Sequence, residues 1–207
     1  MAFASHSFVF LGPPASGKGT QGRRLSDEKG SAYLSTGALL RGALRDDTDL
    51  GRLARPYLDR GEYVPDDIML PGVLDWVKYQ TGGWVLDGFP RTVPQAEALD
   101  AALEKIGLPL PKAMILHVPD DELRRRITCR LECESCHRVA KDGEGDSCPK
   151  CGGPLAPRAD DASGAFESRL AEFHRLVVPT IQYYTDRMRG RIINGTGSPD
   201  EVWVRIS

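Results

Sequence analysis

Residues 12–20, GPPASGKGT, form a glycine-rich segment that includes one lysine, Lys18. The apolar run FVFL precedes it and a helix-like segment follows it, which is the strand–loop–helix context of a phosphate-binding loop. Glycines let backbone N–H groups turn toward an anion, a helix N-terminus adds its positive dipole end, and Lys18 brings charge to the β- and γ-phosphates. The usual pattern has a hydroxyl directly after the lysine, whereas this chain has Gly19 there and Thr20 one place later. The alternative, a glycine-rich turn that binds nothing, is disfavoured by this context.

A second polar group follows another apolar run in WVLDGFPR, residues 84–91. Asp87 stands at the end of that run, where P-loop enzymes keep a carboxylate near Mg²⁺. Gly88 and Pro90 favour a tight turn, so Arg91 would face the crevice at the carboxyl ends of the strands. Alternatively, Asp87 caps the next turn and Arg91 lies in solvent. This alternative is reasonable for either residue alone. It is much weaker for both residues together, because they lie beside a phosphate-binding loop.

Four of the five cysteines occur as two CxxC pairs separated by eleven residues: Cys133, Cys136, Cys148 and Cys151. Two such pairs suit a tetrahedral Zn²⁺ held by four thiolates. Three alternatives stay open: haem attachment at CESCH, His137 in place of one cysteine, and iron at the same sulfurs. Cys129 lies outside both pairs, and we expect it to be a small hydrophobic residue.

The composition bounds the class of protein. The chain has 207 residues, 41% of them hydrophobic, with 27 basic against 29 acidic residues. Balanced charge does not call for nucleic acid or an anionic membrane, and no apolar run reaches the roughly 20 residues of a membrane helix. The N-terminus lacks the basic region of a signal peptide, so we expect a cytoplasmic protein without disulfides.

Alternating elements must position these groups. Short apolar runs at FVFLG, WVLDG, KAMILHVP and RIING suit strands that are buried on both faces of a parallel sheet. Helix-like segments lie between or after them, at residues 20–29, 50–60, 66–80, 94–106, 121–130 and 166–189. The pattern predicts an α/β fold with a parallel sheet. Residues 131–157, rich in Cys, Gly and charge, predict an inserted subdomain held by something other than apolar burial.

Several motifs, taken in order, resemble those of adenylate kinases nearly from end to end. They are GPPASGKGT, YLSTGALLR, RGEYVPDDI, LDGFPRT with Gln95 four residues past Arg91, RRRITCR, the four-cysteine insertion, PRADD and SRL. In that family the loop reads G-K-G-T, which accounts for Gly19. The resemblance implies a P-loop three-layer fold with a central parallel sheet. It divides the chain into a core (1–34, 67–127 and 161–207), an NMP-binding segment (35–66) and a zinc-binding lid (128–160).

The resemblance also implies the reaction: reversible Mg²⁺-dependent transfer of the terminal phosphoryl of ATP to AMP, giving two ADP and maintaining adenine nucleotide balance. The implied ATP site is Ala15, Ser16, Gly17, Lys18, Gly19, Thr20, Arg126, Arg130, Val139 and Gly197. The implied AMP site is Thr36, Arg41, Glu62, Tyr63, Val64, Gly88, Arg91, Gln95, Arg158 and Arg169. The implied catalytic groups are Lys18, Arg91, Arg130, Arg158 and Arg169. A structural Zn²⁺ on the four cysteines and a monomer without nucleic-acid or membrane partners complete the expectation.

Two positions depart from the family pattern. Ala38 stands where an Asp usually follows S-T-G, and we expect an effect on capping of the helix after Thr36 more than on ligand contact. Glu167 stands where an Arg is usual, which changes the charges where the chain leaves the lid. Arg124 and Arg125 are interpreted as a solvated helix face, whereas Arg126 lies one turn before Arg130 and is kept in the site.

Two other functions compete with this one. A zinc-knuckle protein that binds nucleic acid would need a basic surface and aromatic residues beside the cysteines, and the chain offers neither in its sequence. A kinase for UMP or CMP is a nearer rival, and Gln95 is the residue that separates it from an AMP kinase.

Overall fold

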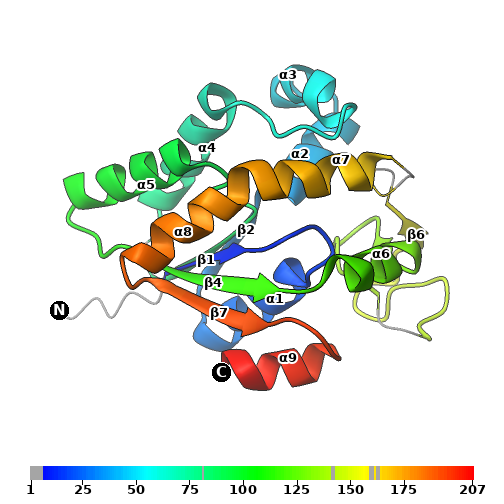
Figure 1. Ribbon diagram of the computed structural model, residues 1–207. Helices are drawn as coiled ribbons and strands as arrows, with labels where there is room; N and C mark the ends of the chain where they lie inside the picture. The colour runs from blue at the N-terminus through cyan, green and yellow to red at the C-terminus, as the bar shows by residue number, and fades with distance from the viewer. Residues whose placement is uncertain (1–6, 81, 141–142, 159–160, 162–163) are drawn as a thin grey trace.

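The computed structural model describes residues 7–80, 82–140, 143–158, 161 and 164–207. Its centre is a five-stranded parallel sheet with strand order β2-β3-β1-β4-β7 (Figure 1). The strands are β1 (Phe8–Leu11), β2 (Ala32–Ser35), β3 (Trp84–Asp87), β4 (Lys112–His117) and β7 (Gly190–Asn194). The predicted α/β fold with a central parallel sheet is confirmed.

Helices cover both faces of the sheet, so β1 and β3 are buried throughout. The helices are α1 (Lys18–Lys29), α2 (Thr36–Arg45), α3 (Asp49–Leu58), α4 (Asp66–Lys78), α5 (Val93–Lys105), α6 (Asp120–Thr128), α7 (Ala165–Glu172), α8 (Val178–Asp186) and α9 (Pro199–Ile206). In Figure 1, α8 crosses the front of the sheet and α1 lies behind it. Alternate residues of β1 enter opposite cores: Phe8 and Phe10 pack with α1 and α9, and Val9 and Leu11 pack with α5 and α8. This makes three layers.

The structure adds elements that the sequence pattern did not single out. Strand β2 is only half-buried because it lies at the sheet edge, so its apolar signal is weak. The segment 166–189 divides into α7, a π-helical turn at Phe173–Val177 and α8. Pro179, at the start of α8, has no backbone N–H, which explains why regular α-helical hydrogen bonding is interrupted just before it.

Two segments project from this core. One is the pair α2 and α3 with the loop to α4. The other carries a two-stranded antiparallel sheet, β5 (Leu131–Cys133) and β6 (Leu155–Pro157), on the side of the molecule where α6 lies. Among the described residues of the second segment, the apolar cluster has Cys133, Cys148 and Leu155 as its buried members, as expected for a unit without its own core.

Helix α2 begins at Thr36 with Ser35 as its N-cap, because the Ser35 hydroxyl accepts a hydrogen bond from the Ala38 backbone N–H (3.4 Å). The cap therefore needs no acidic side chain at position 38.

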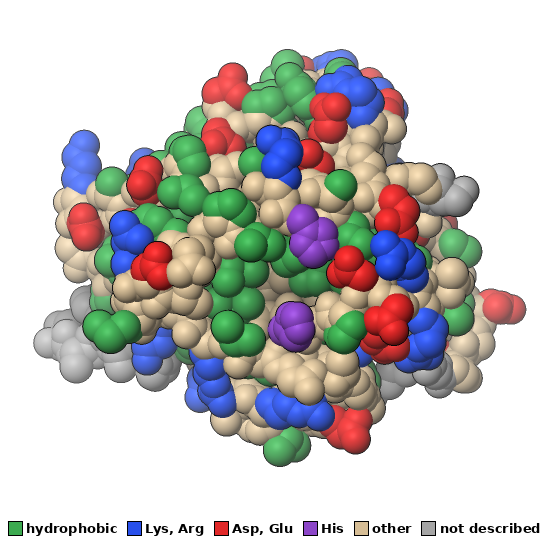
Figure 2. Space-filling model, in the orientation of Figure 1, with side chains coloured by type: hydrophobic (Ala, Val, Ile, Leu, Met, Phe, Trp, Pro, Cys, Tyr) green, Lys and Arg blue, Asp and Glu red, His purple; other side chains and the backbone are tan. Residues whose placement is uncertain are grey.

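The surface is mixed in charge. Figure 2 shows basic and acidic side chains interspersed over the described residues of the face in view. Within the described ranges, none of the helices combines the length and apolar character that crossing a bilayer requires.

A buried ion pair ties α5 to the start of β7. The carboxylate of Asp100 accepts hydrogen bonds from Arg189 (Nη1, 3.1 Å) and from the Tyr183 hydroxyl (2.7 Å), and all but 7% of Asp100 is buried. Such a pair contributes little net free energy of folding, because burying both charges costs about as much as their attraction gains. Removal of one partner is nevertheless strongly destabilising, because it leaves the other charge buried without a partner.

Asp100→Ala should lower the free energy of unfolding by about 3–5 kcal/mol, because it leaves the Arg189 guanidinium buried without its carboxylate. Urea unfolding would measure this loss. Glu97→Ala, on an exposed position of the same helix, is the control and should change stability by less than about 0.5 kcal/mol. Equal losses in the two variants would contradict a role for the ion pair.

Candidate active site

The loop after β1 is shaped by two glycines. Gly12 has φ +148°, and a Cβ there would lie 2.7 Å from the Leu116 carbonyl oxygen, so only glycine fits. Gly17 has φ +93° and is the N-cap of α1, which therefore begins at Lys18. The Lys18 ammonium donates to the Pro13 carbonyl oxygen (2.7 Å) and thus lies across the concave side of the loop. Backbone N–H groups of the loop and the first turn of α1 offer donors to an anion at this point.

Positive charge is concentrated around Lys18. Burial lowers the pKa of Lys18 to about 7, Asp87 opposes this shift, and the cations Arg91, Arg169 and Arg130 add to it. An anion bound among these groups would restore the lysine's charge and relieve the repulsion among the cations.

The structure explains why a glycine stands at position 19. A Cβ at this position would lie 3.3 Å from Asp87 Oδ2 and 3.7 Å from the Tyr33 hydroxyl oxygen. The Tyr33 hydroxyl donates to Asp87 Oδ2 (2.9 Å), and Asp87 is buried. The G-K-G-T form of the loop thus leaves room for a buried carboxylate directly beside it, while Thr20 is exposed.

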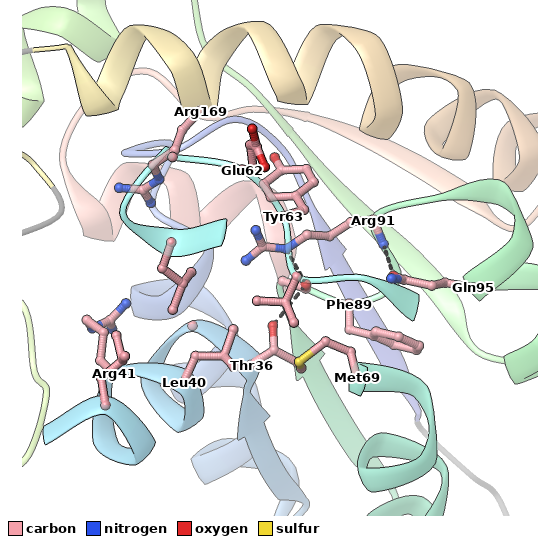
Figure 3. Close-up of a pocket in the computed structure, with 16 residues that line it drawn as sticks. Thr36, Leu40, Arg41, Glu62, Tyr63, Met69, Phe89, Arg91, Gln95 and Arg169 are labelled. Carbon is pink, nitrogen blue, oxygen red and sulfur yellow. Dashed lines mark hydrogen bonds between the residues drawn. The ribbon is translucent and has the colours of Figure 1, made fainter. Parts of the chain in front are cut away.

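A pocket opens between α2, the 61–64 loop and the turn after β3 (Figure 3). Apolar side chains, among them Leu40, Val64, Met69 and Phe89, form much of its wall. Nine of the ten residues expected at the AMP site line the pocket, and they come from four separate stretches of chain: Thr36, Arg41, Glu62, Tyr63, Val64, Gly88, Arg91, Gln95 and Arg169. Arg158 is not among the lining residues.

The turn at 88–91 positions Arg91. Gly88 has φ +81°, the Phe89–Pro90 peptide is cis, and the Thr36 hydroxyl donates to the Gly88 carbonyl oxygen (2.9 Å). Arg91 Nε donates to the same carbonyl oxygen (2.6 Å), and its guanidinium lies 4.2 Å from the centre of the Tyr63 ring. Two contacts therefore hold the Arg91 guanidinium in place.

A second, smaller cavity adjoins the first and is lined by Gly12, Pro14 and Lys18 of the loop. The two cavities share four lining residues: Tyr63, Gly88, Arg91 and Arg169. Arg91 and Arg169 thus stand at the boundary between the pocket and the phosphate loop. Groups bound in the two cavities would meet beside these guanidinium groups.

Gln95 lies at the far side of the pocket from α2 and is buried. Its Oε1 accepts from the Arg91 backbone N–H (2.7 Å), and its Nε2 donates to Asp66 Oδ1 (2.5 Å). Asp66 is a residue that the sequence reasoning missed. The only signal was its place in the motif RGEYVPDDI.

Two further carboxylates that the sequence reasoning missed hold the arginines. Asp161 accepts from Arg130 Nε (2.7 Å) and lies 3.4 Å from Arg169 Nη1. Glu132 lies 3.3 Å from both Arg41 Nη2 and Arg158 Nη1, and is also buried. Each acidic side chain thus joins two arginines that were expected to bind phosphates. A nucleotide phosphate entering here would compete with a carboxylate.

The remaining predicted ATP contacts lie toward α6 and the lid. Arg126 Nη2 donates to the Gly195 carbonyl oxygen (2.9 Å) and lies 3.5 Å from that of Gly197, so the structure brings Arg126 and Gly197 together. Val139 is in the lid, paired with Glu132 in an isolated bridge.

The neighbouring arginines of α6 have acidic partners on the surface. Arg124 forms a two-pronged ion pair with Glu167 (2.7 and 3.0 Å), and Arg125 pairs with Glu122. Both arginines are at least half-exposed, in agreement with a solvated helix face. Glu167, the departure from the family pattern, therefore forms an ion pair with α6.

The four CxxC sulfurs converge in the lid. All lie within 4.8 Å of one another, with Cys133–Cys151 at 3.5 Å and Cys136–Cys148 at 3.7 Å. A tetrahedron with metal–sulfur bonds of about 2.3 Å has sulfur–sulfur edges of about 3.8 Å, so these four thiols could hold a metal ion. The Cys136 backbone N–H donates to Cys133 Sγ and lowers the pKa of Cys133 to about 6. His137 turns its Nδ1 toward Glu132 (3.4 Å) rather than joining the four sulfurs.

Comparison with known proteins agrees with this geometry. The family model described as "Adenylate kinase" matches residues 10–189. The adenylate kinase of Thermodesulfovibrio yellowstonii is 42% identical over 205 residues, 96% of this chain and 95% of that protein. Those of Methanosarcina barkeri and Archaeoglobus fulgidus are 39% and 38% identical, each over 97% of this chain and at least 95% of the relative. Because the match covers nearly the whole chain and the site is built as described, this protein belongs to the adenylate kinase family, the phosphotransferases that convert ATP and AMP to two ADP.

Proposed function

We propose that AMP occupies the larger pocket and that ATP lies across the phosphate loop, with the phosphoryl group passing between Lys18, Arg91 and Arg169. The observation that carries this assignment is the meeting of the two cavities at Arg91 and Arg169. Thr36, Arg41, Glu62, Tyr63, Val64, Gly88 and Gln95 complete the AMP site in this proposal. The loop residues 15–20, together with Arg126, Arg130, Val139 and Gly197, bind ATP.

The chemistry requires charge and position rather than a general base. The phosphate of AMP has a second pKa of about 6 and is mainly a dianion at pH 7, so it is already a nucleophile. The obstacle is repulsion between two polyanions. Guanidinium groups match phosphate oxygens with two parallel hydrogen bonds, and Lys18 adds a point charge. Arg130 and Arg158 would join them when Asp161 and Glu132 give way to phosphate oxygens.

Asp87 is the residue we assign to Mg²⁺. It is a buried carboxylate directly beside the loop, and its one described donor, the Tyr33 hydroxyl, leaves further oxygen lone pairs for a water-bridged ion. When bound with ATP, Mg²⁺ neutralises the charge that develops on the β- and γ-phosphates.

The division into core (1–34, 67–127 and 161–207), NMP-binding segment (35–66) and lid (128–160) is also our proposal. The α2–α3 segment supplies part of the wall of the larger cavity, and the contact of Glu132 with Arg41 joins the two projecting segments. Their closure would exclude water, which is the competing acceptor of the phosphoryl group.

We assign Zn²⁺ to the four cysteines as a structural ion. Four protein thiolates fill a tetrahedral coordination shell and leave no position for substrate. A cytoplasmic monomer without nucleic-acid or membrane partners is the setting we propose, in line with the balanced charge of the chain.

Lys18→Met should lower kcat by at least about 100-fold with little change in melting temperature, because the loop loses its only charged side chain. Steady-state kinetics and thermal unfolding would measure both effects. Lys29→Met, on an exposed position at the other end of α1, is the matched control and should leave kcat unchanged. Near-normal kcat in a folded Lys18→Met variant would contradict the assignment of the loop.

Gln95→Leu should raise KM for AMP with a smaller change in KM for Mg·ATP, because the amide that reads the base is lost. The assay is coupled detection of ADP with AMP, CMP, UMP and GMP as acceptors, for the parent and the variant. The parent should prefer AMP. Equal losses for AMP and Mg·ATP, or a parent that prefers CMP or UMP, would show that the base-binding site is misplaced.

Removal of the metal should unfold the lid and spare the core. Cys151→Ser, or chelation, should lower the melting temperature and reduce zinc from about one ion per chain, because the lid has few apolar residues to hold it. Elemental analysis and melting curves are the measurements. Cys129→Ser is the control, since Cys129 lies outside the four-sulfur group. A metal-free chain with the same melting temperature as the zinc-loaded chain would refute a structural ion.

A further inference from the structure

The amide of Gln95 is held by the protein on both of its ends. A glutamine amide has two N–H donors and an oxygen with two acceptor positions. The Arg91 backbone N–H donates to Oε1 (2.7 Å), a contact visible in Figure 3, and Nε2 donates to the Asp66 carboxylate (2.5 Å). One donor and one acceptor position of the amide remain for a ligand in the pocket.

Asp66 is itself held in place. It lies in the first turn of α4, and its Oδ2 accepts from the Thr92 hydroxyl (3.1 Å). Thr92 is the N-cap of α5 and accepts from the Gln95 backbone N–H (3.2 Å). Asp66, Thr92 and Gln95 thus form a closed set of hydrogen bonds that joins the starts of α4 and α5. Asp66 is not among the residues that line the pocket, so it acts on a ligand only through Gln95.

We propose that Asp66, together with the Arg91 backbone N–H, fixes the orientation of the Gln95 amide and so makes the pocket select a 6-aminopurine over a 6-oxopurine. The proposal rests on the AMP site described above and adds a positioning residue to it. Asp66 determines which way the amide faces, and the direction of the amide determines which base pairs with it.

The selectivity follows from the hydrogen-bonding edge of the base. Adenine offers an acceptor at N1 beside a donor at its 6-amino group. Hypoxanthine, the base of IMP, offers a donor at N1 beside an acceptor at O6. Rotation of the Gln95 amide by half a turn would exchange its donor and acceptor and suit hypoxanthine. Without a constraint on this rotation, a glutamine would accept both bases.

Here the rotated amide meets two unfavourable contacts. Its NH₂ group would face the Arg91 backbone N–H, donor against donor, and its oxygen would face the Asp66 carboxylate, acceptor against a negative charge. Gln95 is buried, so water cannot compensate for these contacts. A site whose polar groups are fixed in this way rejects the ligand that cannot pair with them.

Asp66→Asn tests the proposal, because the new amide can itself rotate and present either a donor or an acceptor to Gln95. The ratio of kcat/KM for IMP to that for AMP should rise about tenfold or more. The change should come from KM of the two acceptors, with KM for Mg·ATP and kcat for AMP close to the parent values. Asp67→Asn is the matched control: it removes the same charge from the same helical turn on an exposed side chain and should leave the ratio unchanged.

Asp66→Ser, which removes the carboxylate and keeps a small polar side chain, provides a second variant if Asp66→Asn does not fold. Its acceptor ratio should move in the same direction. An unchanged IMP-to-AMP ratio in a folded Asp66 variant would overturn the proposal. An equal rise in Asp67→Asn would also overturn it, by showing a general effect of charge. Parallel kinetics of Gln95→Leu separate the two levels, because an unchanged KM for AMP there would overturn the AMP site itself.

Discussion

Concentration of positive charge in a small, half-buried volume is the constraint on which the rest of this structure depends. Two polyanionic nucleotides approach each other only where cations offset their repulsion. Lys18, Arg91, Arg130 and Arg169 lie close enough that the three arginines help to lower the pKa of the lysine to about 7, with burial as the main cause. Such a cluster is costly without an anion, and the structure supplies carboxylates at its margins: Asp87, Glu132 and Asp161.

These carboxylates are positioned by the parallel sheet and the segments inserted at one edge of it. The carboxyl ends of β1 and β3 bring the phosphate loop and Asp87 to adjacent positions, since Phe10 pairs with Asp87 in register. Gly19 leaves room for that carboxylate, and the Gly88–Arg91 turn aims a guanidinium at the boundary of the two cavities. The sheet and the turn after β3 therefore position Asp87 and Arg91, whereas Glu132 lies in the segment that carries β5 and β6, and Asp161 follows β6.

The lid itself follows a different principle of stability. Its short strands pair antiparallel across Leu131–Pro157 and Cys133–Leu155, and its buried cluster contains two cysteines and one leucine. With so little apolar area to bury, four sulfurs within 4.8 Å of one another take the place of a core. This segment therefore does not need to share the core of the sheet domain.

The sequence by itself determined the features that are local in the chain. The phosphate loop, the two CxxC pairs, the four strands that carry strong apolar runs and the order of the motifs could all be read, because each depends on residues close together in sequence. The predicted pocket residues Thr36 and Gln95 could be placed only through the family resemblance, whereas Arg91 was also indicated by the turn that follows a buried strand. The weakly apolar edge strand β2 and the π-helical turn before Pro179 gave no clear pattern.

Only the tertiary structure decided which acidic side chain faces which cation or amide. Glu132 and Arg41 are 91 residues apart, Asp161 and Arg130 are 31 apart, and Asp66 and Gln95 are 29 apart. Acidic residues are frequent in this sequence, and nothing near Asp66 in the chain distinguishes it from Asp67. The difference arises from packing. Asp66 lies between the starts of α4 and α5 and accepts a hydrogen bond from the buried Gln95, and such a bond is stronger away from water; Asp67 is exposed to solvent.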